Sequence, residues 1–157
     1  MTDLQAENVQ TYPRPPALEP VPQRIRIWLG DTLIVSTTDA LRVLETHHAP
    51  TYYIPRAAIG AEVTPAPGRS FCEWKGVARY WTLRAGGVTA PRCAWDYPEP
   101  AAAFAALAGH LALYAHAMDR CAVGDTDVVP QPGDFYGGWV TPNLTGRIKG
   151  APGTEGW

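Results

Sequence analysis

Residues 71–98 read FCEWKGVARYWTLRAGGVTAPRCAWDYP, and this stretch decides the fold. Its first part is strand-like up to about residue 84, with a break near Lys75-Gly76, and AGG at 85–87 forms a short loop. The run that follows returns as another strand, in which Pro91 indicates an edge position or a bulge. Neighbouring strands of this length predict an antiparallel sheet as the framework of the chain.

Shorter hairpins are predicted on both sides of this stretch. In 23–36 (QRIRIWLGDTLIVS), isoleucines alternate with arginines before a tight turn at Gly30-Asp31. The segment CAVGDTDVVP, 121–130, is typical of a hairpin around Gly124-Asp125. Both hairpins support a β-rich domain.

A single helix is predicted over about 100–118. Pro100 suits the first helical position. The apolar residues that follow recur at spacings of three and four, as one stripe: Phe104, Leu107, Leu111, Tyr114 and Met118. The predicted fold class is therefore α+β: a compact, mainly antiparallel, barrel-like sheet with one packed helix.

The chain divides into three predicted parts. Residues 1–22 are an extended, Pro-rich lead-in, 23–129 form a single β-rich domain, and 130–157 form a Gly/Pro-rich arm. The arm carries Phe135, Tyr136, Trp139 and Trp157. Because disordered segments are poor in aromatic residues, we expect the arm to pack on the domain.

Composition excludes several classes of function. The 157 residues carry a net charge of −2, which leaves no basic footprint for nucleic acid. No apolar run is long enough to cross a membrane, and the first residues lack the features of a secretory signal. The odd number of cysteines, Cys72, Cys93 and Cys121, predicts free thiols in the cytoplasm. Nothing in the sequence indicates a homodimer.

Polar groups inside apolar runs supply the candidates for catalysis. Cys72 is a nucleophile if Lys75 lowers its pKa, although in one continuous strand the two side chains point to opposite faces. Glu45, in ALRVLETHH, needs a partner such as Arg42, Arg79 or Lys75, or else faces a pocket. The histidine spacings match no metal site, so no metal or other cofactor is predicted.

Aromatic residues supply the candidates for ligand binding. If 77–84 pair with 88–95 across a three-residue loop, Trp81 and Trp95 share one face, unless a bulge at Pro91 shifts the phase. The predicted pocket is built from Glu45, Tyr53, Lys75, Tyr80, Trp81 and Trp95. The alternative is that these rings are only core.

Four segments carry a resemblance to a known family: ALRVLETHHAPTYYIPR, FCEWKGVARYW, AWDYPEP and the closing FYGGWVTP…KGAPGTEGW. They resemble the family called domain of unknown function 427, over about residues 12–157. The resemblance implies a compact β-rich fold of the β-tent or Mss4-like group and no settled activity, although the family has been labelled nucleotidyltransferase-like. Ala57-Ala58 replaces the family's usual acidic pair, and the CxxC pairs that bind zinc in β-tent proteins are missing.

Three functional hypotheses follow. The first is a cytosolic protein that binds a small molecule in an aromatic-walled pocket. The second is an enzyme that acts on a small molecule through Cys72, or through Lys75 and Glu45. The third is a protein-interaction module that uses the C-terminal arm.

Overall fold

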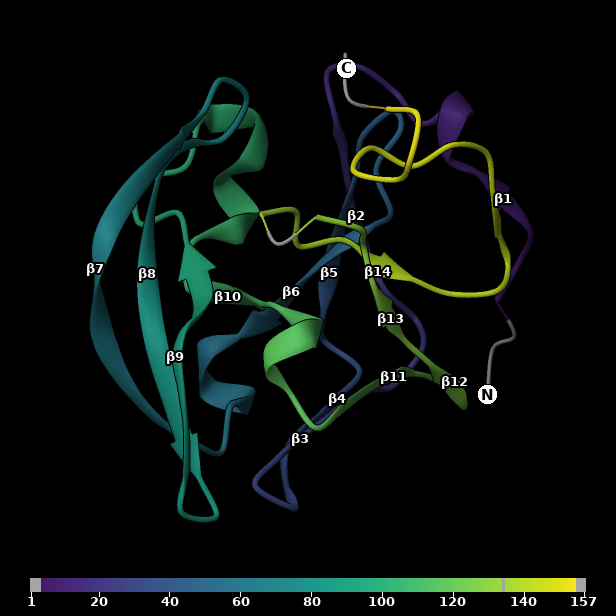
Figure 1. The fold of residues 1–157 in the computed structure, drawn as a ribbon. Helices are drawn as coiled ribbons and strands as arrows, with labels where there is room; N and C mark the ends of the chain where they lie inside the picture. The colour runs from purple at the N-terminus through teal and green to yellow at the C-terminus, as the bar shows by residue number, and fades with distance from the viewer. Residues whose placement is uncertain (1–3, 134, 155–157) are drawn as a thin grey trace.

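A computed structural model describes residues 4–133 and 135–154 of the chain. Trp157, one of the aromatic residues predicted to pack in the arm, lies outside the described residues. Figure 1 shows the long strands β7 (Glu62–Cys72), β8 (Gly76–Ala85) and β9 (Val88–Asp96) on one side of the molecule. The C-terminal segments lie on the other side, beside the start of the chain.

The remaining strands and the 3-10 helices, labelled η, are short. They are β1 (Glu7–Asn8), η1 (Val9–Thr11), β2 (Ala17–Pro20), β3 (Ile25–Leu29), β4 (Thr32–Thr37), β5 (Leu41–Leu44), β6 (Thr51–Pro55), η2 (Arg56–Ala58), η3 (Ala102–Leu107), β10 (His110–Leu113), η4 (Ala115–Ala117), β11 (Arg120–Val123), β12 (Thr126–Asp127), β13 (Val129–Pro130), β14 (Trp139–Val140) and β15 (Leu144–Thr145).

Antiparallel sheets form the framework, as predicted. The larger sheet has seven strands in the order β2-β5-β6-β10-β9-β8-β7, and a four-stranded sheet has the order β12-β11-β3-β4. Two-stranded pairs, β1 with β15 and β13 with β14, tie the ends of the chain to the rest. Within the described residues the edge strands β2 and β7 do not pair with each other, so the large sheet is not a closed barrel. The lead-in is also more than a surface segment, because β2 is a strand of this sheet.

Both predicted short hairpins are confirmed. In β3, buried Ile25, Ile27 and Leu29 alternate with half-buried residues, and β4 returns antiparallel to it. Gly30 and Asp31 both have a φ of 60°, the left-handed conformation that a two-residue hairpin turn needs. The second hairpin pairs β11 with β12 around Gly124-Asp125.

The predicted helix over 100–118 is only partly helical. The segment forms η3, then strand β10, then η4. Gly109 lies between η3 and β10 with a φ of +78°, which a right-handed helix cannot accommodate. Strand β10 pairs with β6 on one side and β9 on the other, and three of its four residues are buried. A strand that is buried on both faces lacks the alternation of apolar and polar residues that identifies most strands. Its apolar residues therefore matched the spacing expected of a helix.

The core has two main parts. One lies around β3, β4 and β11 and includes Ile25, Ile27, Leu113 and Trp139. The other gathers the aromatic residues of the large sheet, chiefly Tyr53, Tyr80, Trp95, Tyr97, Phe104 and Tyr114. The aromatic part borders the cavity described next.

Candidate functional site

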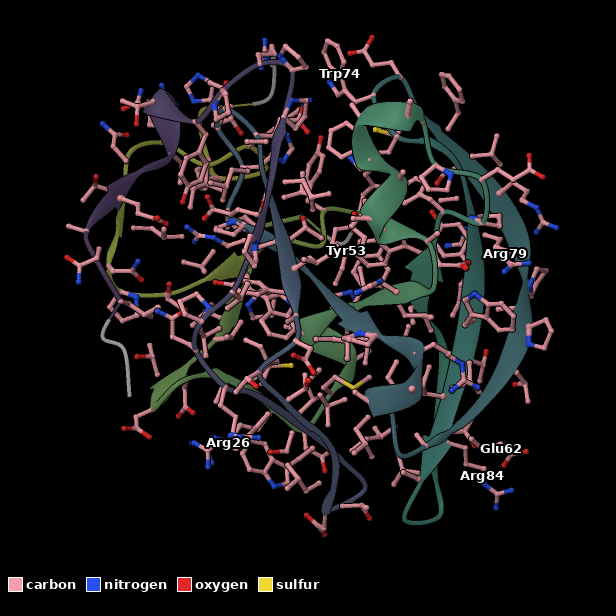
Figure 2. The ribbon with its side chains drawn as sticks, turned by 180° about the vertical axis from the view of Figure 1, so that it is seen from behind. Arg26, Tyr53, Glu62, Trp74, Arg79 and Arg84 are labelled. Carbon is pink, nitrogen blue, oxygen red and sulfur yellow. The ribbon has the colours of Figure 1, made fainter. Side chains whose placement is uncertain are left out.

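The turn between β7 and β8 places Lys75 in the interior. Cys72 pairs with Gly76, so residues 73–75 form the turn and are not part of either strand. The alternation of a strand therefore does not apply to Lys75, and the separation of Cys72 from Lys75 expected for one continuous strand is not observed. Both residues line the same cavity. Figure 2 shows Trp74 at this tip, at the same end of the molecule as η3.

This inner cavity has a volume of about 250 Å³. It brings together five of the six predicted binding residues, which are Glu45, Tyr53, Lys75, Tyr80 and Trp95. Cys72 also lines it, as do residues outside the predicted set of six: His48, Tyr97, Tyr114, Phe135, Tyr136 and Lys149. Figure 2 shows Tyr53 near the centre of the molecule.

Trp81 is not among the residues that line the inner cavity, and the prediction that it shares one face of the sheet with Trp95 is wrong. Trp95 lies opposite Tyr80, and Trp81 lies opposite Ala94. The turn has two residues, since Ala85 pairs with Val88, and changing the loop length by one residue moves every side chain of a strand to the other face. The bulge predicted near Pro91 is present but does not restore the expected phase.

On the opposite face, Trp81 belongs to a closed polar cluster. Its indole nitrogen donates to Asp96 Oδ1 at 2.9 Å, and Arg79 donates to both oxygens of the same carboxylate at 2.9 and 3.1 Å. The Arg79 guanidinium lies 5.1 Å from the Trp81 ring centroid. Figure 2 places Arg79 toward the outer surface. This arrangement is structural, because every charged group in it has a partner.

Neither predicted arginine partner reaches Glu45. Arg42 donates to Glu7 Oε2 at 2.7 Å and to Glu19 Oε1 at 2.7 Å. Burial raises the pKa of Glu7, but hydrogen bonds from Arg42 and Tyr12 lower it further, so the net shift is downward. Arg79 is held by Asp96, as described above. Glu45 lines the cavity instead, where its Oε2 lies 4.0 Å from His48 Nε2.

Lys75 combines a charged side chain with low exposure and no polar partner among the described residues. It is only 7% exposed, and no hydrogen bond or ion pair of its ammonium is found within the described residues. The Nζ atom lies 5.7 Å from the ring centroid of Tyr97 and 5.8 Å from that of Phe104. Aromatic rings attract a cation but do not replace an anion or a hydrogen-bond acceptor. Lys75 therefore presents an unpaired positive charge to the cavity.

Three tyrosines of the wall, Tyr53, Tyr97 and Tyr114, are neutral hydroxyl groups. Burial raises the pKa of Tyr114 to about 12, and it raises those of Tyr53 and Tyr97 above their ordinary value of 10. Tyr80 donates its hydroxyl to Ser70 Oγ at 2.8 Å, and Tyr114 donates to the Phe135 carbonyl at 3.1 Å. The wall thus offers flat apolar faces with a few fixed polar edges.

The C-terminal arm completes the cavity. Trp139 is 1% exposed, stacks on Tyr52 with centroids 4.9 Å apart, and donates its indole N–H to the Leu113 carbonyl at 3.1 Å. The glycines before it are needed for close approach. A Cβ on Gly137 would lie 2.0 Å from Trp95 Cη2, and one on Gly138 would lie 2.2 Å from Gln131 Oε1. The double glycine in FYGGW was the sequence signal for this contact.

A second, larger cavity opens beside the first. It has a volume of about 490 Å³ and shares Glu45, His48 and Lys149 with the inner cavity. Arg14, His47, Glu73 and Trp74 are among its other lining residues. Phe71 and Phe135, which also line the inner cavity, are 75% and 67% exposed and form an apolar rim.

The other sequence candidates have no place in this arrangement. Cys93 and Cys121 are buried free thiols, and burial raises their pKa values to about 11 and about 12. Ala57 and Ala58 belong to η2 and line neither cavity. In the part of the chain that the structure describes, no group of His, Cys, Asp and Glu is suited to hold a metal. No described helix is long and apolar enough to cross a membrane.

The sheets and the aromatic cavity are those of a small antiparallel β domain of undefined activity. The profile of a family described as a domain of unknown function (DUF427) matches residues 17–124, and the chain belongs to this family. Comparison with curated proteins gave no match. The matched residues contribute Glu45, Tyr53, Lys75, Tyr80 and Trp95 to the cavity, and the arm beyond residue 124 contributes its remaining wall.

Proposed function

We propose that the protein binds a small molecule that carries a flat apolar body and an anionic group. The observation that carries this proposal is the unpaired ammonium of Lys75 in a cavity walled by aromatic rings. A buried charge is costly unless it is paired, and a ligand anion supplies the missing partner. The rings of Tyr53, Tyr80 and Trp95 supply apolar contact for the body of the ligand.

The size of the cavity limits the ligand. About 250 Å³ lies below the range of roughly 300–1,000 Å³ that drug-sized ligands occupy. The inner cavity therefore suits one ring with short substituents. A larger ligand would extend past Phe71 and Phe135 or into the second cavity.

The test compares two ligands of one shape, benzoate and the neutral benzamide. Hydrogen bonds to charged groups contribute about 1.5–3 kcal/mol, so benzoate should bind roughly 10- to 100-fold more tightly. Titration calorimetry should show that Lys75→Met, which keeps the length of the side chain but removes the charge, abolishes this preference. Lys75→Arg is the matched control and should retain most of it. If benzamide binds wild type as tightly as benzoate, the proposal is wrong.

An enzyme that uses Cys72 is the second candidate, and one observation favours it. Cys72 is half-buried and lines the cavity together with Lys75 and Glu45. A thiol beside a binding site for an anionic ligand fits attack on a bound electrophile. The rate of alkylation of Cys72 against pH separates the candidates. A midpoint well below the reference thiol pKa of about 8.5 favours the enzyme, and an ordinary midpoint favours binding alone.

A further inference from the structure

Gln131 is a buried amide whose orientation is fixed by the backbone. It is 3% exposed, lies near the start of the C-terminal arm, and bonds both to the loop that carries His48 and to Lys149 farther along the arm. Its Oε1 accepts from the N–H of Ala49 at 3.1 Å, and its Nε2 donates to the carbonyl of Lys149 at 3.0 Å. A backbone N–H only donates and a carbonyl only accepts, so these two bonds settle which end of the amide is nitrogen.

The orientation of Gln131 sets the tautomer of His48. The same Nε2 lies 3.2 Å from His48 Nδ1, and because an amide nitrogen only donates, Nδ1 must be the acceptor. The imidazole therefore carries its proton on Nε2. That atom lies 4.0 Å from Glu45 Oε2, which is too far for a direct hydrogen bond.

The surroundings keep His48 neutral. Burial lowers its pKa to about 4, and the positive charges of Lys149, Lys75, Arg14 and His47 act in the same direction. The carboxylate of Glu45, 4.0 Å away, does not reverse this balance. At neutral pH the contact between His48 and Glu45 is thus no ion pair. The oriented N–H of His48 faces the carboxylate of Glu45 across a gap, and both residues line the inner cavity.

We propose that His48 and Glu45 recognise a hydroxyl group of the ligand. A hydroxyl both accepts and donates, so it matches a pair made of one N–H and one carboxylate oxygen. An oxygen atom about 2.8 Å from each of two atoms 4.0 Å apart completes a triangle without strain. The inference rests on the proposed function and narrows its ligand class to small hydroxy acids with a ring.

The first test measures the tautomer directly. Long-range ¹H–¹⁵N correlation spectra of the histidine rings should show His48 as the neutral Nε2–H form at neutral pH. In Gln131→Glu the new carboxylate accepts a hydrogen bond and therefore favours a proton on Nδ1 of His48. The spectrum should shift toward the Nδ1–H or the doubly protonated form. The wild-type spectrum alone suffices if this variant does not fold. A protonated Nδ1 in wild type overturns the inference.

The second test uses a pair of acids that differ by one hydroxyl. Mandelate, measured as each enantiomer, should bind wild type about tenfold more tightly than phenylacetate in at least one hand. His48→Phe should remove this ratio, and His48→Gln, which keeps an N–H donor, should retain part of it. If both acids bind wild type equally and Lys75→Met loses this binding, recognition of the hydroxyl is refuted but the proposed function is supported. If neither acid binds, the proposed function fails and the inference fails with it.

Discussion

Gly137→Ala tests whether the arm shapes the cavity through Trp95. The added Cβ would lie 2.0 Å from Trp95 Cη2 and 2.8 Å from Cζ2, whereas carbon atoms in contact stay about 3.5–4.0 Å apart. The Trp95 ring or the arm must therefore move by roughly 1 Å or more. Trp95 is 8% exposed and has Tyr114 behind it, with ring centroids 4.6 Å apart, so the ring has little room.

Overpacking of this kind costs about 1–3 kcal/mol, which corresponds to a fall in Tm of roughly 2–12 °C for a domain of this size. Thermal unfolding followed by circular dichroism measures the loss, and near-ultraviolet bands of tryptophan report the moved ring. Gly60→Ala is the matched control, because its nearest contact is 3.3 Å away at the Ile34 carbonyl and its φ is also ordinary. If Gly137→Ala and Gly60→Ala have the same Tm, the close packing of Gly137 against Trp95 is refuted and the description of this wall is wrong.

Three further predictions follow from burial and charge. Trp95→Ala should lose about 3–5 kcal/mol in chemical denaturation and half-exposed Trp81→Ala roughly half as much, so equal losses would contradict the assignment of their faces. Iodoacetamide should alkylate Cys72 before the two buried cysteines, whose pKa values are raised by burial, and peptide mass spectrometry that finds uniform labelling would refute this. Because the folded-state pKa of Glu7 lies below its ordinary 4.5, its contribution to stability should be complete above that pH and lost as the pH falls through the lower value. Arg42→Met should flatten this acid limb of a Tm-against-pH curve, and an unchanged limb would show that the pair is not its cause.

Local patterns in the sequence predicted much of the framework. Both short hairpins follow from alternation and Gly-Asp turns, which depend on residues close together in the chain. Strand β10 was missed because its environment comes from β6 and β9, which are distant in sequence. Burial on both faces removed the periodicity that a single sequence offers.

The sequence predicted most of the proposed residues that line the cavity but not how they are arranged around it. Five of six proposed binding residues line one cavity because charged and aromatic residues in apolar runs tend to face such spaces. Trp81 was misplaced by one residue of loop length at 85–87, which alternation alone does not determine. Gln131 and Lys149 had no signal near Glu45 in the chain, and only the path of the arm brings them to it.

The enclosed charges of Arg42 and Asp96, elsewhere in the chain, are paired, and this is the strongest argument that the cavity is a binding site and not a packing defect of the core. The guanidinium of Arg42 is held by two carboxylates, and buried Asp96 accepts from both Arg79 and Trp81. The fold therefore pairs its enclosed charges wherever they serve structure. At the cavity, none of the described residues supplies an anion to the Lys75 ammonium, and His48 Nε2 lies 4.0 Å from Glu45 Oε2, beyond hydrogen-bond distance. A ligand that offers a partner to all three groups at once gives a physical reason for their arrangement.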